Sequence, residues 1–590
     1  MEMNASLNIR INQVLLFIVL ALAFVYNPVT SDWGAKPTTY LFFFTSLLFS
    51  ILLIPSYFSG LVMRLNPIDL TVLLFFVLLI VHVIYLFCTN SLSIDDYLLT
   101  YAAIGILYFP LRSLIQKDCS SVVQVFSLIF DIQVVLGICQ LTFALIKNID
   151  SSLFVTGTLG HSGMYAIYLV AYLPVRIKKV AKVKKTLILV VIFILLLMTE
   201  SRTGICLYLI VLANLSRHYL SNFYHRTKGK TWLIVSSAIA LITLVSLLIY
   251  IKLPSAMGRI FIWQNSFNLF LKKPFLGWGY GGFQKEYLNQ QAFFFEHNSA
   301  NEMYTSVASS ISTPFNEYIK LLVNFGFVGF AIFGFALFSL YKFLWTTNSN
   351  TSFSFSFFLI LLSALVYFSF QSVGLLLVAI LCLVYLADHS WPDIYINWCL
   401  KIKSKLILII KLTLLTFCTF LLSNNFNQFV ATLKWRQAIR FIPNQPELAM
   451  NVYSQIYDRL HHRPSFIYNY GVELYNLRKY NQAQKMFAKL LEQFVTLDGV
   501  MYFAKASQAV GQYDLAEQYF KQASFMVPNK FQPKYHLFKL YDHLKSEKNA
   551  AIVAQEILDM PIKVPSQEVD HIRKRVKQYI KLELNNQYNF

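Results

Sequence analysis

The sequence predicts an all-α protein, in which a polytopic bundle of about 12–13 membrane spans precedes a helical-repeat solenoid. Three observations predict this fold class. Hydrophobic residues make up 56% of the chain and charged residues 13%, whereas soluble domains carry about 25% charged residues. The mean hydropathy is +0.53. After Leu422 charged residues become frequent and apolar runs shorten. These features exclude a disordered chain, a secreted disulfide scaffold and an ordinary cytosolic enzyme.

Thirteen apolar segments are candidate spans, and four of them (the fourth, sixth, eighth and twelfth) are shorter than the roughly 20 residues that cross a bilayer. No small-residue cleavage site follows the first run, which predicts a retained span. The thirteen segments are 11–26, 38–57, 69–88, 97–111, 121–146, 163–176, 184–199, 203–217, 231–252, 316–341, 354–370, 372–388 and 404–423.

The basic residues between these segments predict one orientation. Lys and Arg crowd the loops after the sixth, eighth and twelfth spans, whereas the loop after the third (89–96) has none. Cytoplasmic loops are the basic ones, so the N-terminus is predicted inside. The long loop at about 253–315 and the domain at 424–590 then face the periplasm of a bacterial inner membrane. Residues 1–423 form the predicted transmembrane domain.

The net charge of +21 would suggest a nucleic-acid partner in a soluble protein. Here the charge is explained by membrane flanks, which argues against nucleic acid and for contact with membrane lipids. The seven cysteines show no CxxC or Cys/His spacing, and no Asp, Glu and His cluster has ligand spacing. We therefore expect no disulfide framework, no metal and no cofactor.

A repeat is visible in the C-terminal domain. Tyr480, Ala483 and Phe487 recur 33 residues later as Tyr513, Ala516 and Phe520. At the same offset, the small residue Gly471 corresponds to Ala504. A poorer third unit runs from Tyr535 through Ala550 and Ala554. The region at about 433–560 resembles the tetratricopeptide repeat, in which small residues lie where paired helices touch. An irregular helical tail is the alternative. A solenoid of this kind commonly binds a ligand or a protein partner in its concave face.

Polar residues concentrate in the long loop and at the starts of neighbouring spans. The loop contains Gly258-Arg259 with Trp263, and later Pro274 with Gly277, Gly279 and Phe283. The span after the loop starts at Phe315-Asn316-Glu317 and continues to Gly326 and Gly329. Gly157 with His161, and Ser201-Arg202-Thr203-Gly204, lie at the same predicted face.

In these motifs the chain resembles the O-antigen ligase and polymerase family. The resemblance covers about 150–340 by motif, and the whole membrane part by layout. It implies a glycosyltransferase that moves a glycan from an undecaprenyl-diphosphate carrier to a hydroxyl acceptor. Lipid A core sugars, a growing polysaccharide and protein Ser/Thr are all open as acceptors, so ligase, polymerase and protein oligosaccharyltransferase are not separated.

The chemistry of the residues agrees with this resemblance. A departing diphosphate needs cations, and the planar guanidinium group binds phosphate oxygens in pairs. We therefore expect Arg202 and Arg259 to be catalytic; the alternative for each is an anchoring arginine that snorkels to the interface. Lys273 is a secondary phosphate contact or a solvated loop residue. Trp278 and Tyr280 either stack on sugars or anchor the loop at the interface.

The departure from the family is Phe315, where many members carry a histidine thought to activate the acceptor. General-base catalysis needs another group. Glu317 is our first choice, because a helix N-terminus keeps it ionised, and His297 is the second; Glu296 and Glu302 also lie nearby. His161 and Asn316 are expected to contact glycan or to cap helices.

Two questions stay open in the sequence. Asp131 lies within the fifth span, where a carboxylate is costly and needs a partner that the sequence does not name.

The rival functions are a polysaccharide flippase or exporter, and a scaffold that presents the repeat domain. A flippase needs a polar path through the spans, and charged residues other than Asp131 are few there.

Overall fold

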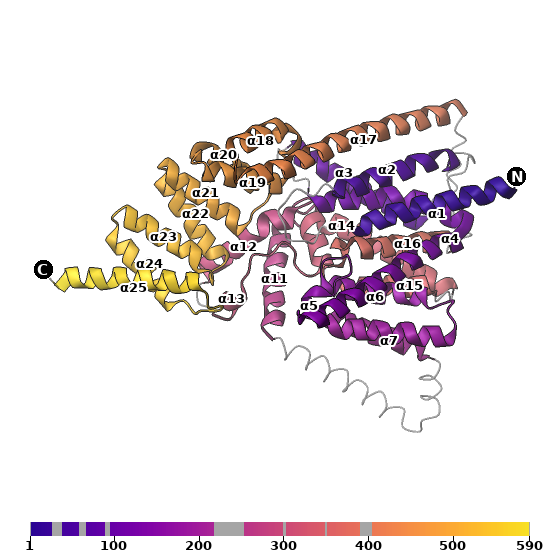
Figure 1. Cartoon of the computed structure of the whole chain (residues 1–590), viewed down its shortest axis with the longest axis horizontal. Coiled ribbons are helices and arrows are strands. Elements are labelled where there is room, and N and C mark those ends of the chain that lie inside the picture. The colour runs from indigo at the N-terminus through magenta and orange to yellow at the C-terminus, as the bar shows by residue number, and fades with distance from the viewer. Residues whose placement is uncertain are drawn as a thin grey trace, which may run out of the picture.

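The computed structural model describes residues 2–25, 38–57, 66–88, 95–217, 253–298, 302–347, 351–389 and 404–588, and these residues form helices and no strand. The helices fall into a bundle, a set of loop helices and a repeat domain (Figure 1). The bundle contains α1 (Glu2–Val25), α2 (Thr38–Tyr57), α3 (Pro67–Cys88), α4 (Asp96–Lys147), α5 (Ser151–Phe154), α6 (Ser162–Arg176), α7 (Lys182–Met198), α8 (Arg202–Leu215), α14 (Glu317–Thr347), α15 (Ser352–Ala364), the 3₁₀ turn η1 (Ser369–Gln371) and α16 (Val373–His389).

The bundle confirms the predicted helical membrane domain. Among the residues that the structure describes, three helices are long and apolar enough to cross a membrane: Pro67–Cys88, Asp96–Lys147 and Glu317–Tyr341. Several other predicted spans are apolar helices of 10–17 residues, among them Arg202–Leu215 and Val373–Asp388. The ninth predicted span, 231–252, lies outside the described residues.

Helix α4 combines the fourth and fifth predicted spans. Asp118, with φ −155° and ψ 87°, is extended between two helical halves. Its carboxylate accepts the backbone N–H of Ser121 at 3.1 Å, so it caps the second half. The start of α4 contacts the long loop through Asp95 and Tyr280, at 2.5 Å. The second half holds the segment before α6, where the Gln140 side chain donates to the Gly157 carbonyl at 2.7 Å.

Ends of helices that are distant in sequence meet at one end of the bundle, which we call the loop end. There the start of α6 contacts the turn between α15 and α16, because the hydroxyl of Tyr367 lies 2.8 Å from His161 Nδ1. At the opposite end the Asn66 amide donates to the Ala387 carbonyl at 2.6 Å and joins α3 to α16. Successive helix ends therefore lie alternately at the loop end and at the opposite end of the bundle, as expected for helices that cross a membrane.

The loop helices are α11 (Leu253–Lys272), α12 (Gly282–His297) and α13 (Glu302–Val307). Figure 1 shows α11 running across the loop end, with α12 and α13 beside the repeat helices. The loop is joined to the bundle at a break in α14, where Gly326 has φ 61° and ψ −158°. Such a break leaves two N–H and two C=O groups without their helical partners.

The glycine segment of the loop supplies those missing partners. Phe327 and Val328 donate to the carbonyls of Pro274 and Phe275 at 2.8 and 3.1 Å. In the reverse direction, the N–H groups of Trp278 and Gly279 donate to the carbonyls of Val323 and Asn324 at 2.9 and 2.8 Å. A Cβ on Gly277 would lie 2.5 Å from the Asn324 backbone. The motif glycines thus allow two backbones to approach closely.

The repeat domain confirms the predicted helix pairs. Ala483, Phe487, Ala516 and Phe520 are fully buried, and a Cβ on Gly471 would meet the Phe487 ring at 2.9 Å. The small residues therefore lie where paired helices touch. The helices are α17 (Ser404–Phe441), α18 (Pro446–Leu460), α19 (Pro464–Asn476), α20 (Tyr480–Gln493), α21 (Leu497–Val510), α22 (Tyr513–Met526), α23 (Phe531–His543), α24 (Glu547–Asp559) and α25 (Gln567–Tyr588).

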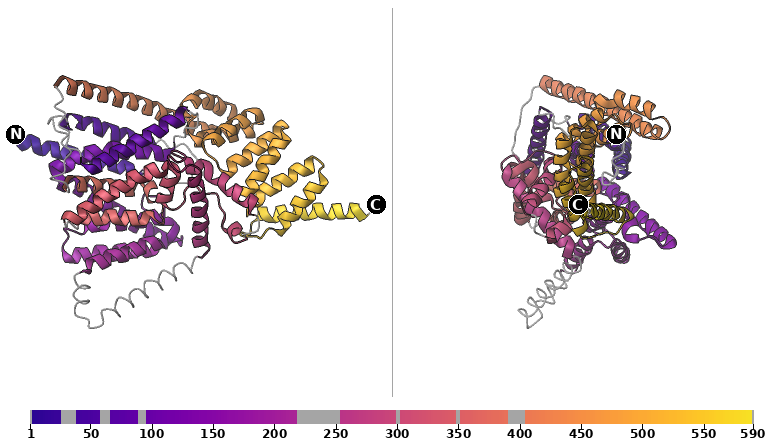
Figure 2. Two further views of the ribbon diagram at one scale, coloured as in Figure 1. Left: turned by 180° about the vertical axis from the view of Figure 1, so that it is seen from behind. Right: turned by 90° about the vertical axis from the view of Figure 1, so that its left-hand side faces the viewer.

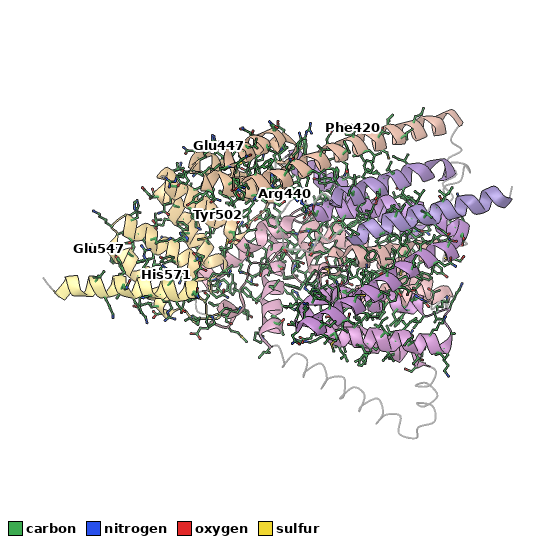
Figure 3. The ribbon with its side chains drawn as sticks, viewed as in Figure 1. Phe420, Arg440, Glu447, Tyr502, Glu547 and His571 are labelled. Carbon is green, nitrogen blue, oxygen red and sulfur yellow. The ribbon has the colours of Figure 1, made fainter. Side chains whose placement is uncertain are left out.

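Bundle and repeat domain are joined at three places. Helix α17 is continuous across the predicted boundary at 423/424, and Figure 3 shows Phe420 and Arg440 on that one helix. Arg463, which is 5% exposed, forms an ion pair with Asp96 and donates to the Tyr40 hydroxyl at 2.9 Å. The loop contacts α22, where Gln522 donates to Asn289 at 3.1 Å. The left view in Figure 2 shows the repeat helices continuing from the loop end.

Ion pairs of the bundle include two that join different helices. Asp131 has a partner that the sequence did not name: Arg176 binds it with two hydrogen bonds of 2.9 Å each. Asp69, which is 0% exposed, pairs with Arg112 and accepts the Tyr108 hydroxyl at 2.8 Å. The buried Asp69 is thus paired, as the cost of burying an isolated charge requires.

Candidate functional site

The first predicted catalytic arginine begins α8 at the loop end. Ser201 caps this helix, because its hydroxyl accepts the N–H of Gly204 at 3.2 Å. A Cβ on Gly204 would meet Ala166 at 2.8 Å, so the glycine lets α8 pack closely on α6. The motif Ser201-Arg202-Thr203-Gly204 thus combines a cap, a cation at the first helical position and a close contact. Arg202 is half-buried there.

The second predicted arginine lies on α11, one turn from Trp263. The Trp263 indole donates to the Pro314 carbonyl at 2.9 Å. The Arg259 guanidinium lies over the Phe315 ring, 5.7 Å from its centroid, and donates to the Val366 carbonyl at 2.9 Å. The two residues of the G-R-x-x-x-W motif therefore hold the segment that precedes α14.

The two arginines lie close enough to interact electrostatically. Desolvation lowers the pKa of Arg259, and the positive charge of Arg202 lowers it further. Guanidinium groups stay charged in proteins, so the effect is repulsion between two cations. Two such cations at the loop end have the charge that a multivalent anion would match.

A segment that the sequence did not single out connects these groups. Between α15 and α16, Val366 accepts Arg259, and Tyr367 contacts His161. The Phe368 ring lies 5.6 Å from the rings of both His161 and Phe315. This segment was included in an apolar span and carries no charge, so its only sequence signal is the polar run Ser369 to Ser372.

Phe315, which stands at the position of the family histidine, has a strained backbone. Its φ is 53°, a left-handed conformation that bulky residues seldom adopt. The ring is held between Arg259 and Phe368. Strain of this kind persists where surrounding contacts fix it, and it is commonly found at functional sites.

His161 is fixed as a neutral hydrogen-bond donor. Its Nδ1 accepts the N–H of Gly163 at 3.1 Å, and a backbone N–H only donates. Nδ1 therefore carries no proton, and the Tyr367 hydroxyl donates to it at 2.8 Å. The proton of the neutral ring is then on Nε2, which lies 3.4 Å from the same hydroxyl. Desolvation lowers the pKa of His161, which favours its neutral form.

Asn316 and Glu317 begin α14 with different roles. Asn316 caps the helix, since its side-chain oxygen accepts the N–H groups of Tyr318 and Ile319 at 3.0 and 3.1 Å. The Glu317 side chain is 4% exposed, and its Oε1 accepts the N–H of Phe370 at 3.1 Å. Its Oε2 lies 3.9 Å from Lys320 Nζ. Glu317 therefore adjoins the segment that positions Arg259.

Three predicted binding residues serve to dock the loop. The Trp278 indole donates to the Leu269 carbonyl at 2.9 Å, and Lys273 Nζ lies 4.1 Å from its ring centroid. Tyr280 donates to Asp95. Their contacts are thus with the protein around the break in α14, and they are not brought to the arginine pair.

His297 is also apart from this cluster. It ends α12 at an exposed position, where its Nδ1 lies 2.9 Å from the Phe293 carbonyl and its ring stacks on Phe293 at 4.2 Å. The start of α12 is the end that meets α14, through Phe283 N–H and the Asn324 side chain at 3.0 Å. Fifteen residues of helix separate the two ends, about 22 Å.

A cavity of about 310 Å³ lies inside the bundle next to the loop end. Tyr280, Glu317 and Lys320 line it at the loop end, and most other lining side chains are apolar or aromatic, apart from Thr71 and Asn324. Helices α3, α4, α14 and α16 contribute these apolar residues, down to Leu340. In the described ranges no group of three or more His, Cys, Asp or Glu side chains could hold a metal ion.

Comparisons with known proteins address the part of the chain that carries the arginines. The family model described as O-antigen ligase matches residues 187–334, which include Arg202, Arg259 and Glu317 but neither His161 nor Tyr367. No curated protein matches the chain. The solved "Crystal structure of APC/C hetero-tetramer Cut9-Hcn1" is similar at 10% identity over 82% of this chain and 76% of that chain, with a TM-score of 0.22. The family match confirms the resemblance of the motifs: this membrane protein carries, over residues 187–334, a domain of the O-antigen ligase and polymerase type.

Proposed function

We propose that the protein transfers a glycan from an undecaprenyl-diphosphate carrier to a hydroxyl acceptor at the loop end, on the periplasmic side of a bacterial inner membrane. The observation that carries this proposal is the mutual approach of Arg202 and Arg259 beside Phe315 and His161. Two like charges repel each other unless an anion lies between them. A diphosphate has the charge and the oxygen geometry to bind both guanidinium groups.

The surroundings suit a lipid donor. The apolar cavity among α3, α4, α14 and α16 offers room for part of an isoprenoid chain, with its polar end toward Glu317 and Lys320. A diphosphate at the loop end would lie at the depth of lipid headgroups. Bond cleavage at the anomeric carbon leaves negative charge on the diphosphate, and the arginines stabilise that charge as it develops. His161 Nε2–H is oriented to donate a further hydrogen bond.

We propose Glu317 as the residue that takes the proton of the acceptor hydroxyl. Oε1 is engaged by Phe370, so Oε2 is the oxygen that would receive the proton. The reaction is then a single displacement: the acceptor oxygen bonds to the anomeric carbon, its proton goes to Oε2, and the lipid diphosphate leaves. His297 is the alternative base, and its exposed position at the end of α12 makes it the weaker candidate.

The test of the donor site is turnover of purified protein with a lipid-linked glycan and three acceptor types: lipid A core, polysaccharide and a Ser/Thr peptide. Charge-assisted hydrogen bonds contribute about 1.5–3 kcal/mol each. Arg202→Ala and Arg259→Ala should therefore each lower turnover about 10- to 100-fold or more. Lys replacements should recover only part, because Lys lacks the planar fork. Near-normal turnover in both Ala variants would remove the diphosphate proposal, and Arg217→Ala at the other end of α8 is the matched control.

The base is tested by turnover against pH for wild type, Glu317→Gln and His297→Ala. A general base commonly contributes about 10²–10⁴-fold. Loss of the acidic limb in Glu317→Gln supports the assignment. A drop of less than about threefold with an unchanged profile would exclude it, and loss of that limb in His297→Ala alone would transfer the role to the histidine.

A further inference from the structure

Helix α11, which runs across the loop end in Figure 1, has an apolar outward face that continues into the turn after it. Ile260, Phe267 and Leu271 are exposed, and their spacing of seven and four residues places them on one face of the helix. The turn adds Phe275 and Leu276, which are 74% and 58% exposed. Exposed apolar side chains that lie together in this way mark a contact with a protein or with a membrane.

The turn is held against α3 at a level well inside the end of that helix. The Leu276 carbonyl lies 3.1 Å from His82 Nε2. His82 is six residues before Cys88, the last residue of α3, and is therefore about 9 Å from that end. The 22 residues of α3 span about 33 Å, close to the roughly 30 Å of a bilayer's hydrocarbon core. Phe275 and Leu276 are thus at the depth of the outer part of the acyl chains.

The apolar outer surface of the bundle continues into this turn. On α3, the side chains of Val81 and Ile84 beside His82 are exposed. On α14, the exposed Phe327 packs edge-to-face on Phe270 of α11, with the ring centroids 5.1 Å apart. A soluble partner would have to enter the bilayer to reach this surface, so the contacts favour lipid as its occupant.

Two lysines stand at the edge of the apolar face. Lys272 ends α11 and Lys273 follows it, and both are exposed. Their Nζ atoms lie 5.3 Å from the ring centroid of Phe293 and 4.1 Å from that of Trp278, respectively. Lipid phosphates lie directly outside the acyl chains, and cations with aromatic rings beside them are typical of that layer. The lysines are thus suited to bind anionic headgroups.

We infer that this surface binds the bilayer leaflet at the loop end and selects anionic phospholipid there. Its apolar side chains enter the acyl region, and its two lysines contact the phosphates. Helix α11 also carries Arg259, thirteen residues before Lys272, so the leaflet holds the helix that positions this arginine. We call the surface the leaflet patch, and it consists of Phe267, Leu271, Lys272, Lys273, Phe275 and Leu276.

The test is labelling of the full chain by a membrane-impermeant maleimide, with single copies reconstituted in nanodiscs. Phe275→Cys reports on the leaflet patch, and Asn298→Cys, at the exposed end of α12, is the matched control in water. Peptide mass spectrometry measures each cysteine separately, so the seven native cysteines stay in place. Maleimide reacts with the thiolate, which is disfavoured among acyl chains. Phe275→Cys should therefore react at least about tenfold more slowly than Asn298→Cys.

Lipid composition tests the lysines. Discs of phosphatidylcholine with about 30% phosphatidylglycerol should protect Phe275→Cys about 5- to 30-fold more than phosphatidylcholine alone, because each lysine near an anionic surface contributes about fivefold. Adding Lys272→Gln and Lys273→Gln to Phe275→Cys should abolish this difference. Adding Lys548→Gln and Lys563→Gln, two exposed lysines at the far end of the repeat domain, should leave it unchanged.

The possible outcomes separate the two parts of the inference. Equal labelling of Phe275→Cys and Asn298→Cys in the discs would overturn the leaflet contact in favour of a soluble partner or a second copy. Protection that does not depend on phosphatidylglycerol, or that depends on it equally without the two lysines, would overturn the selection of anionic lipid. Leu271→Cys, on the helix, should follow Phe275→Cys, so a local defect in one variant does not decide the result. No measurement here involves glycan transfer, so this inference and the proposed function fail separately.

Discussion

Replacing Gly277 by Ala should detach the long loop from α14 locally, without unfolding the rest of the chain. Gly277 has φ 70°, and a Cβ there would lie 2.5–2.6 Å from the backbone atoms of Asn324 and Phe325. Backbone atoms cannot move aside as a flexible side chain does. The loop must therefore retreat, and the hydrogen bonds that Trp278 and Gly279 donate to α14 are lost.

Gly281 provides a matched control for this substitution. Its φ is 77°, close to that of Gly277, but nothing lies within 4 Å of a Cβ built on it. Both Ala variants carry left-handed strain of about 1–2 kcal/mol. Gly277→Ala additionally loses two backbone hydrogen bonds, each with a net value of about 1 kcal/mol. The difference of about 2 kcal/mol corresponds to about a 30-fold difference in the local opening equilibrium.

Amide hydrogen exchange measures that opening directly. The peptide that contains Trp278 and Gly279, whose N–H groups lose their partners, should exchange about 30-fold faster in Gly277→Ala than in Gly281→Ala, while peptides of α21 stay unchanged. Glycan transfer should fall in parallel, because the same loop carries Arg259. Equal exchange in the two variants, within about threefold, would refute the role of the interlocked backbones. Equal acceleration in α21 would show global unfolding.

Three further results are expected. Tyr367→Phe should lower turnover about 5- to 10-fold, since one hydrogen bond of about 1 kcal/mol orients His161, while Tyr385→Phe on α16 should have no effect. Burial and two neighbouring lysines lower the pKa of His536 to about 3 from 6.5. Between these two pH values the unfolded state binds a proton at this residue and the folded state does not, so folding becomes less favourable as the pH falls. The thermal stability of His536→Phe should therefore fall less steeply toward pH 4 than that of wild type. Arg463→Ala leaves the Asp96 carboxylate without its counter-ion at a cost of about 3–5 kcal/mol, and unchanged hydrogen exchange in α19 would contradict that ion pair.

The sequence predicted those parts of the structure that depend on local pattern. Apolar runs predict helices wherever they are long, and the recurrence of Ala483 and Phe487 predicts the paired repeat helices, because both are local properties. The sequence identified the motif glycines, but it did not show that they allow the loop backbone to approach α14. The partners of Trp278 and Gly279, next to Gly277, are carbonyl groups 45 residues further along the chain, and only the break at Gly326 makes them available.

Long-range contacts explain what the sequence could not supply. Asp131 and Arg176 are 45 residues apart, and each looks like an isolated charge until two helices pack. Val366 and Tyr367 carry no charge and lie in an apolar run, so nothing local marks them as the support of Arg259 and His161. The roles of Trp278 and Tyr280 were left open between sugar stacking and anchoring, and their hydrogen bonds to Leu269 and Asp95 have an anchoring geometry.

The contact of Arg463 with Tyr40 and Asp96 has a consequence for the order of synthesis. The ribosome makes the arginine 423 residues after the tyrosine and 367 residues after the aspartate. The bundle can therefore be inserted long before this contact exists. Asp96 gains Arg463 as its counter-ion only when the C-terminal domain has been made, so the final structure of the bundle depends on completion of the chain.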